Sequence, residues 1–251
     1  GRRILRALLV VPFVLPTLVV GAALQATFER LGFDGRRGPD LDGTVTAILL
    51  AHMVLNVAVV VRVVGSHWAL IDPRTEEAAR VLGASRWRVW REVTAPRLAP
   101  AVLGAAGIVF LFCFTSFGVI LTVGGPGNPT LETEIWRYAT RRTDIATATA
   151  LALLQMVVVV GLVVVVGGLE RRAAGTVAHR PVPPAPLSTW RRRIGVVVAL
   201  APAATLVAVP LAVLVERSLV VGDGHGLDHY RALFRETANG LSVPPIDAVR
   251  S

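Results

Sequence analysis

The chain has 251 residues, of which 53% are hydrophobic, and it carries a formal net charge of +9. A mean hydropathy of +0.61 is too high for an ordinary water-soluble domain, so the composition indicates a membrane protein. The single cysteine, Cys113, excludes a disulfide within the chain, and its apolar surroundings predict a buried hydrophobic side chain.

Five stretches that lack Asp, Glu and Arg approach or exceed the roughly 20 residues that a helix needs to cross a bilayer. They predict an all-α, polytopic membrane protein with about five transmembrane helices. In chain order the stretches are 7–28, 43–61, 98–131, 145–169 and 194–215. Pro12 and Pro16 predict a kink in the first stretch, and a polar turn is expected in the third after about Val123.

All 26 basic residues are arginines, and their placement predicts the orientation of the helices. If the first helix starts inside, the segments 1–6, 62–97 and 170–193 are cytoplasmic and hold 16 of the 26 arginines but only 5 of the 17 acidic residues. Such an excess of arginine is typical of the cytoplasmic side of a membrane protein. It explains the net charge without nucleic acid as a partner.

A polar segment between the second and third apolar stretches predicts a helix-turn-helix. Asp72 can cap a first helix that begins at Pro73, where the missing N–H costs nothing. Gly83 can end this helix in a left-handed conformation, and Ser85 can cap a second short helix. We expect Pro96 to stop the second helix.

The first of these helices has a nearly flat face, because Ala79 and Gly83 are four residues apart, and Glu77 flanks that face. The spacing of the segment resembles the EAA loop of binding-protein-dependent ABC importer permeases, E-A-A-x3-G-x9-I-x-L-P. Val93 stands at the Ile position and Ala95 at the Leu position. The matching residues are Glu77, Ala78, Ala79, Gly83 and Pro96.

The resemblance implies a type I transmembrane domain in a bacterial plasma (inner) membrane, with residues 72–96 on the cytoplasmic side. In this family the loop docks into a groove of a separate ABC ATPase subunit, which works as a dimer and binds the ATP. The chain itself would therefore hold no cofactor. A periplasmic or lipid-anchored binding protein would deliver the solute. The residues expected to couple to the ATPase are Glu77, Ala78, Ala79, Gly83 and Pro96.

Two groups of polar residues at membrane depth are candidates for the translocation path. His52 and Asn56 are four residues apart and share one helix face, while Thr115 and Ser116 follow a run of phenylalanines. The alternative role for these side chains is hydrogen bonding between helices. Two residues do not make a metal site, and no other His or carboxylate has metal-ligand spacing with His52.

The run FCFTSFG, the turn GGPGNPTLETEIW and the following ALALLQ resemble the branch that imports ferric iron or thiamine, in which two permease halves are often fused. Residues 1–170 would be the first half without its N-terminal part, 171–193 a cytoplasmic Pro- and Arg-rich linker, and 194–251 the start of the second half. The EAA pattern occurs once, so a second coupling loop is expected beyond Ser251.

Three other functions fit the sequence less well. An ion-coupled secondary transporter of a small solute would place Asp, Glu or Arg within the spans, and the five apolar stretches contain none. An enzyme would need a motif such as HExxH, GxSxG or a Walker-type Gly-Lys-Ser/Thr, and the sequence has none of them. DNA binding through Arg86, Arg88 and Arg91 is less favoured than cytoplasmic placement of these arginines.

Overall fold

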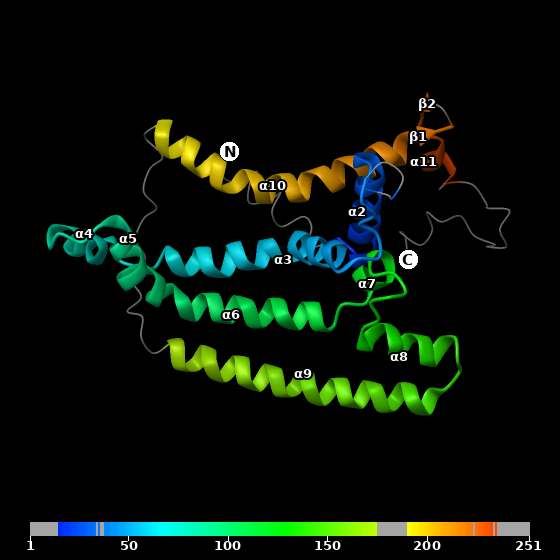
Figure 1. The fold of residues 1–251 in the computed structure, drawn as a ribbon, viewed down its shortest axis with the longest axis horizontal. Helices are drawn as coiled ribbons and strands as arrows, with labels where there is room; N and C mark the ends of the chain where they lie inside the picture. Colours follow the sequence, from blue (N-terminus) through cyan, green and yellow to red (C-terminus); the bar gives the residue numbers. More distant parts are fainter. Residues whose placement is uncertain are drawn as a thin grey trace.

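A computed structural model describes residues 15–33, 35, 38–174, 190–222, 224–232 and 234. Four long helices run along the long axis of the molecule (Figure 1): α3 (Val45–Trp68), α6 (Ala95–Phe114), α9 (Ile145–Ala174) and α10 (Trp190–Leu219). A shorter helix, α2 (Thr17–Leu31), crosses them.

The remaining elements are short and lie at the two ends of the long helices. One end carries α4 (Pro73–Val81), α5 (Arg86–Val89) and the π-helical turn η1 (Trp90–Thr94). The other end carries α7 (Gly118–Val123) and α8 (Leu131–Thr140). Beside it, α10 is followed by a two-stranded antiparallel hairpin, β1 (Val220–Val221) and β2 (Gly224–His225), and by α11 (Asp228–Ala232).

Among the described residues, four helical segments are long and apolar enough to cross a membrane: 45–68, 86–114, 145–168 and 200–219. They confirm the all-α, polytopic fold. The first apolar stretch is different, because residues 7–14 and Pro12 lie outside the described residues. Its described part, α2, has 15 residues and starts immediately after Pro16, so Pro16 precedes the helix instead of kinking it.

The turn predicted after about Val123 is confirmed, since α7 ends at that residue, but the third apolar stretch is not one span. Its helix, α6, ends at Phe114, and the chain bends before α7 begins at Gly118. The bend brings α7 against α2, where a Cβ added to Gly118 would lie 2.2 Å from Thr17 Oγ1. A straight continuation of α6 would lose this close contact, so tertiary packing overrides the apolar pattern.

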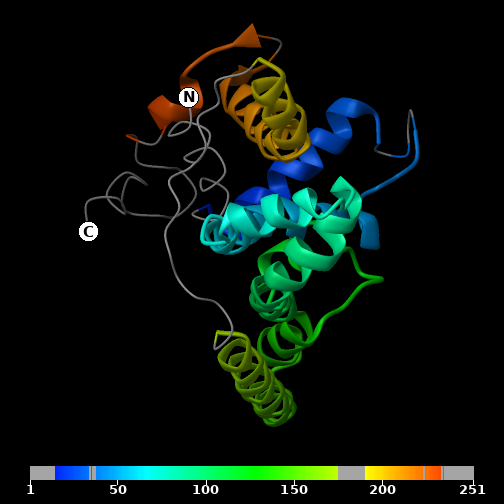
Figure 2. The same cartoon turned by 90° about the vertical axis from the view of Figure 1, so that its left-hand side faces the viewer.

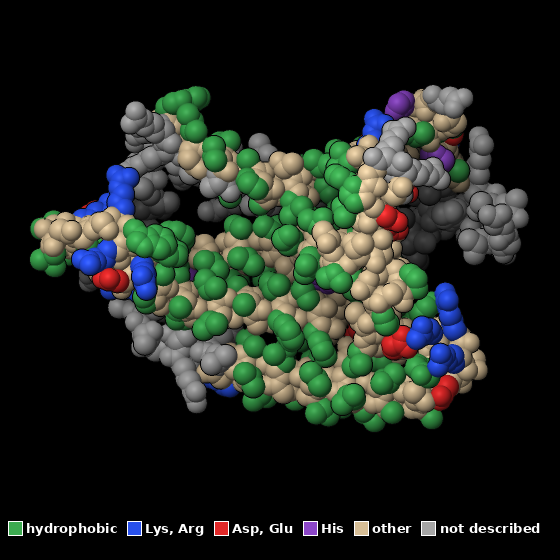
Figure 3. Space-filling view, in the orientation of Figure 1, with side chains coloured by type: hydrophobic (Ala, Val, Ile, Leu, Met, Phe, Trp, Pro, Cys, Tyr) green, Lys and Arg blue, Asp and Glu red, His purple; other side chains and the backbone are tan. Residues whose placement is uncertain are grey.

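The charged and apolar surfaces are separated along the molecule. The space-filling view shows hydrophobic side chains along the long helices and arginines at both ends (Figure 3). The C-terminal end of α9 and the N-terminal end of α10 lie at the same end as α4 and α5; Figure 2 views this end directly. The described parts of segments 62–97 and 170–193 therefore share one end of the bundle.

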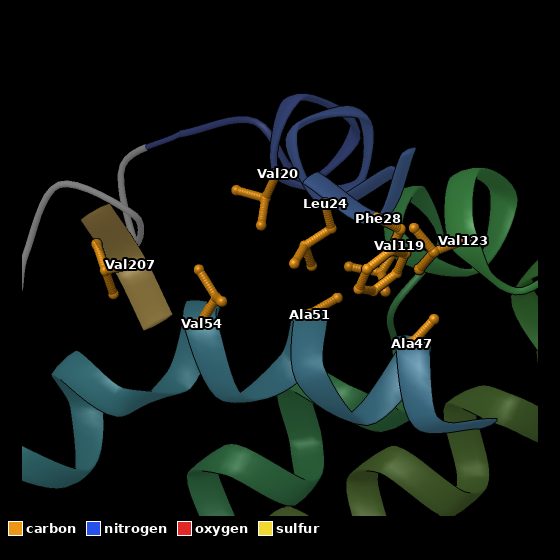
Figure 4. Packing of buried hydrophobic residues seen from close by; sticks show 9 residues of the cluster. All are labelled: Val20, Leu24, Phe28, Ala47, Ala51, Val54, Val119, Val123 and Val207. Atoms are coloured by element: carbon orange, nitrogen blue, oxygen red, sulfur yellow. The ribbon is translucent and has the colours of Figure 1, made fainter. Parts of the chain in front are cut away.

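The hydrophobic core lies where α2, α3, α7 and α10 meet (Figure 4). Alanines on α3 allow the larger side chains of α2 and α7 to pack directly against its backbone. The buried cluster consists of Val20, Leu24, Phe28, Ala47, Ala51, Val54, Val119, Val123 and Val207. This core fixes α2 across the end of α3, next to the candidate translocation residues.

Candidate functional site

The first helix of the polar loop has the two ends that the sequence predicts. The Asp72 side chain accepts a hydrogen bond from the backbone N–H of Arg74 at 2.9 Å, and Pro73 is the first helical residue. At the other end Gly83 has φ +85° and donates its N–H to Arg80 O at 2.9 Å. The next N–H, of Ala84, reaches Ala79 O at 3.0 Å, which completes a Schellman motif.

The second helix is capped by Ser85 as predicted, but the prediction that Pro96 stops it is wrong. Ser85 Oγ accepts from Arg88 N at 3.3 Å. The helix then continues through η1 into α6, and Pro96 lies in the first turn of α6. The wider π-helical turn before Pro96 accommodates its missing N–H and its bulky ring. Residues 86–114 therefore form one continuous helical rod.

Polar contacts hold α4 against the base of this rod. Thr94 Oγ1 donates to Glu76 Oε1 at 2.7 Å, and Thr94 is only 2% exposed. Arg97 Nη1 donates to Thr75 Oγ1 at 2.6 Å. Since Arg97 belongs to α6, these two bonds join α4 to both η1 and the start of the spanning helix.

The motif residues lie on the free surface of the loop. Glu77, Ala78, Gly83 and Pro96 are exposed, while Ala79 is half-buried. A Cβ added to Gly83 would have no atom of the described chain within 4 Å. Every residue of α4 is at least partly exposed, so a partner can reach this face without any rearrangement of the loop.

Sequence reasoning missed an apolar patch next to the motif. Val81 and Leu82, at the end of α4, are each 87% exposed. Trp87 and Trp90 stack with their ring centroids 5.0 Å apart, and both are exposed. The sequence does contain a sign of this patch, because four large apolar side chains occur in an otherwise polar segment. Exposed apolar residues of this kind mark interaction surfaces.

A cavity of about 380 Å³ lies beside the core, between α2, α3 and the bend that follows α6. The structure brings all four candidate translocation residues together in its wall: His52, Asn56, Thr115 and Ser116. Asp, Glu and Arg are absent from the described lining. The other described residues in the wall are Leu15, Thr17, Leu18, Leu55, Phe112, Phe117 and Gly118.

The polar groups of the cavity wall are only partly satisfied. His52 Nδ1 lies 2.8 Å from Ile48 O, and because a carbonyl only accepts, Nδ1 is the donor of this bond. Asn56 Nδ2 donates to His52 O at 2.9 Å and lies 3.8 Å from Cys113 Sγ. Within the described residues, His52 Nε2 and Ser116 Oγ are buried without a hydrogen-bond partner.

These observations bear on the two roles expected for the polar residues. The contact between Asn56 and Cys113 joins α3 to α6, which matches the alternative of bonding between helices. The orphan atoms of His52 and Ser116 are not explained in that way, because buried polar atoms normally find partners. Among the described residues, no group of three or more His, Cys, Asp and Glu side chains could hold a metal ion.

Apolar helices of spanning length, joined by an exposed polar loop, define a multi-pass membrane protein. Residues 1–174 match the family of binding-protein-dependent transport system inner membrane components, and the chain belongs to that family. This membership confirms the ABC importer permease resemblance and is evidence against the ion-coupled alternative. The relatives are transport permeases, so the prediction that the chain is not an enzyme is also confirmed.

Three relatives show how far the likeness extends. The chain is similar to the sulfate transport system permease protein CysT of Escherichia coli (strain K12), with 34% identity over 139 residues, 54% of this chain and 50% of the relative. It is 35% identical over 188 residues to the molybdenum transport system permease protein ModB of Mycobacterium tuberculosis (strain ATCC 25618 / H37Rv), covering 69% of this chain and 67% of the relative.

The third relative is the thiamine transport system permease protein ThiP of Escherichia coli (strain K12). It is 32% identical over 161 residues, which cover 64% of this chain but only 28% of the relative. The chain thus spans half of CysT and a smaller part of ThiP. Three different solutes appear in these names at similar identity, so the likeness does not single out an iron or thiamine branch.

Proposed function

We propose that the chain forms part of the translocation path of an ATP-driven importer and couples it to a separate ABC ATPase dimer through α4 and α5. One observation carries this proposal: α5, the second helix of the exposed EAA-like loop, continues without a break into the spanning helix 86–114, and polar bonds hold α4 to that helix. A displacement of the loop therefore passes directly to a helix of the path. ATP is bound by the partner, and the chain contributes contacts and joints.

The free surface of the loop suits an ATPase groove. Val81 and Leu82 provide apolar contact area, and Glu77 lies on the same helix as a carboxylate acceptor. Bonds from Thr94 and Arg97 keep α4 in a fixed position relative to α6. An apolar centre with charged residues around it is typical of protein interfaces.

The orientation follows from the arginines. Segments 62–97 and 170–193, both rich in arginine, contribute to the same end of the bundle, and we assign this end to the cytoplasm. The α7–α8 end then faces the periplasm, where a periplasmic or lipid-anchored binding protein delivers the solute. The membrane is the bacterial plasma (inner) membrane.

The cavity is the best candidate for part of the solute path. It combines apolar walls with polar groups from His52, Asn56, Thr115 and Ser116, and it borders the bend after α6. Its described lining holds no Asp, Glu or Arg, so formal charge in the wall selects neither an anion nor a cation. We keep thiamine or ferric iron as the proposed solute, on the resemblance of the run FCFTSFG and the turn GGPGNPTLETEIW to that branch.

Two fused permease halves form the remaining part of the proposal: 1–170, the linker 171–193, and 194–251 as the start of the second half. The family match ends at residue 174, and α10 supplies another helix of spanning length after it. The small share of ThiP that the chain covers is consistent with a longer, two-half permease.

Binding of the ATPase tests the coupling surface. The full-length permease would be co-purified with its ATPase from membranes, comparing Glu77→Ala with Glu92→Ala. Both residues are exposed acids on the loop, but only Glu77 belongs to the motif. We expect Glu77→Ala to reduce recovery of the ATPase at least about tenfold, as for the loss of an interface contact worth about 1.4 kcal/mol, and Glu92→Ala to leave it unchanged. Equal recovery with both variants would contradict the coupling role.

Uptake into proteoliposomes tests the solute. The full complex with its binding protein would be supplied separately with thiamine, ferric iron, sulfate and molybdate. Uptake of thiamine or ferric iron that falls in Ser116→Ala supports both the solute class and the cavity. Uptake of sulfate or molybdate alone would refute the proposed solute and leave the coupling test untouched.

A further inference from the structure

A second, smaller cavity forms a groove between α6 and α9, and it shares no described residue with the cavity whose wall contains His52. The volume of this α6–α9 groove is about 220 Å³, and its described wall contains only glycines and apolar side chains. Two glycines, Gly107 of α6 and Gly167 of α9, leave part of the wall without side chains. A Cβ added to Gly107 would lie 2.6 Å from Val166 Cγ1, so the groove follows from close packing of the two helices.

Most of the surface of α9 is exposed. The helix forms one edge of the bundle (Figure 1), and only 6% of its most apolar 18-residue window is buried inside the structure. Val163, which lines the groove, is 52% exposed, so the groove opens to the surroundings of the helix. At the depth of a spanning helix these surroundings are the acyl chains of lipids.

One charged side chain lies at the rim of the groove. Arg171 Nη2 would lie 4.0 Å from a Cβ added to Gly167. Arg171 is exposed, and no described side chain forms an ion pair or hydrogen bond with it. The apolar span ends at residue 168, so this guanidinium lies at the membrane boundary. An arginine at that depth can bind a headgroup phosphate through two parallel hydrogen bonds.

The distance between Arg171 and the deep end of the groove fits one lipid leaflet. Leu162 lines the groove and precedes Arg171 by nine residues, which is about 13 Å along a helix that rises about 1.5 Å per residue. Half of a hydrocarbon core of about 30 Å is about 15 Å. A lipid whose phosphate is at Arg171 therefore has an acyl chain beside the groove over its whole length.

We propose that the α6–α9 groove binds an acyl chain of one anionic phospholipid, whose phosphate group is held by Arg171. Basic sites between spanning helices bind acidic headgroups, and the rim has no described carboxylate to pair with the cationic group of a zwitterionic lipid. The site lies outside the proposed function. Only its assignment to the cytoplasmic leaflet rests on the proposed orientation.

Lipid retention by the purified full-length permease tests the headgroup contact. Native mass spectrometry in detergent would compare dioleoylphosphatidylglycerol with dioleoylphosphatidylcholine, which have the same acyl chains. We expect tighter binding of the anionic lipid, and Arg171→Ala should weaken it about fivefold, the effect of one arginine near acidic lipid. Arg171→Lys keeps the charge and should retain most of the preference. Arg62→Ala, which removes an exposed arginine of α3 outside the groove, should change nothing.

A substitution within the groove tests the contact with the acyl chain. Val163→Trp fills the groove and should weaken binding of both lipids at least about tenfold, because each buried CH₂ group of the chain contributes to binding. Val164→Trp is the matched control, since Val164 is 62% exposed and does not line the groove. Both variants add a tryptophan to an exposed site of the same helix, so a general effect on folding would appear in both.

Equal binding of the two lipids by the native permease would overturn the inference, as would an unchanged preference in Arg171→Ala or unchanged binding in Val163→Trp. Displacement of the lipid by inorganic phosphate would assign the site to free phosphate instead. Failure to retain any lipid would mean that a protein segment covers the groove, and this too would overturn the inference. The measurement uses neither the ATPase nor a solute and does not depend on the leaflet, so failure of the transport proposal remains distinguishable.

Discussion

The EAA-like loop, residues 72–96, and the junction of α2, α3 and α7 are stabilised by different kinds of contact. In the loop, the hydrogen bonds that define the helix ends are local. Asp72 caps α4 by accepting from Arg74 N, and Ser85 caps α5 by accepting from Arg88 N. At the junction the hydrogen bonds are long-range. Gln25 Nε2 donates to Thr122 O at 2.8 Å and contacts both carboxylate oxygens of Asp42 at 3.1 and 3.2 Å.

The helix ends of the loop are therefore determined by residues within the loop itself. The junction depends on burial and on contacts between distant segments, so its helices keep their positions relative to one another. Substitutions that act on only one of these two regions can test the distinction.

The largest effect is expected at the junction, for Gly125→Ala. Gly125 has φ +62°, and a Cβ there would lie 2.7 Å from the backbone Cα of Gly43. An L side chain at positive φ costs about 1–2 kcal/mol, and overpacking adds about 1–3 kcal/mol. We expect a loss of about 2–4 kcal/mol, measured as a lower denaturation midpoint of the purified full-length protein.

Gly127→Ala is the matched control for this substitution. Gly127 lies in the same turn, and a Cβ there would have no described atom within 4 Å. Its stability should stay within about 0.5 kcal/mol of the native value. If both variants lose stability equally, the loss comes from strain in the turn and not from the contact between Gly43 and Gly125.

A smaller effect on folding, but a large one on transport, is expected for Gly83→Val in the loop. The positive φ of Gly83 disfavours a β-branched residue, yet its Cβ would meet open space. Stability should fall by only about 1–2 kcal/mol, while uptake should drop at least about tenfold relative to ATP hydrolysis by the assembled complex. Gly83→Asn, which tolerates the left-handed conformation, is the control. Full uptake by Gly83→Val would refute its role as a coupling joint.

The two regions also differ in what the sequence predicts. Asp72, Gly83 and Ser85 determine helix ends through their own backbone neighbours, so their positions follow from residue type alone. The bend at Thr115 could not be predicted in this way, because it depends on α7 packing against α2 from far along the chain. The continuation of the helix through Pro96 required a π-helical turn that no residue pattern indicated.

The cavity could be predicted from the sequence in part. Polarity at membrane depth predicted His52, Asn56, Thr115 and Ser116 as candidates, and the structure places all four in one wall. Their shared location depends on how α3 meets the bend after α6, which is tertiary information. The sequence therefore identified the side chains, and the fold supplied the cavity that unites them.

The next effect in size is expected for Thr94→Val, which tests whether α4 is fixed to the rod. The substitution keeps the shape of this buried residue but removes its 2.7 Å hydrogen bond to Glu76. The free energy of local opening of α4 should fall by about 1 kcal/mol, measured by amide hydrogen exchange. Ser66→Ala, which removes a bond within α3 only, is the control. Unchanged exchange in α4 would mean that other contacts hold the loop in place.

The smallest effect is expected at Asp144, a local cap at the start of α9. Hydrogen bonds from the side chain and backbone of Thr147 hold the pKa of Asp144 below its usual value of 3.8, with help from the Arg142 charge and against a small effect of burial. Because the folded pKa is lowered, its stabilising contribution is complete above about pH 4 and is lost as the pH falls through the lowered pKa. Amide protection of Thr147 and Ala148 should decline over this range in the native protein. In Asp144→Asn, which keeps an acceptor but cannot titrate, that decline should be absent; the same decline in both proteins would assign it to another group.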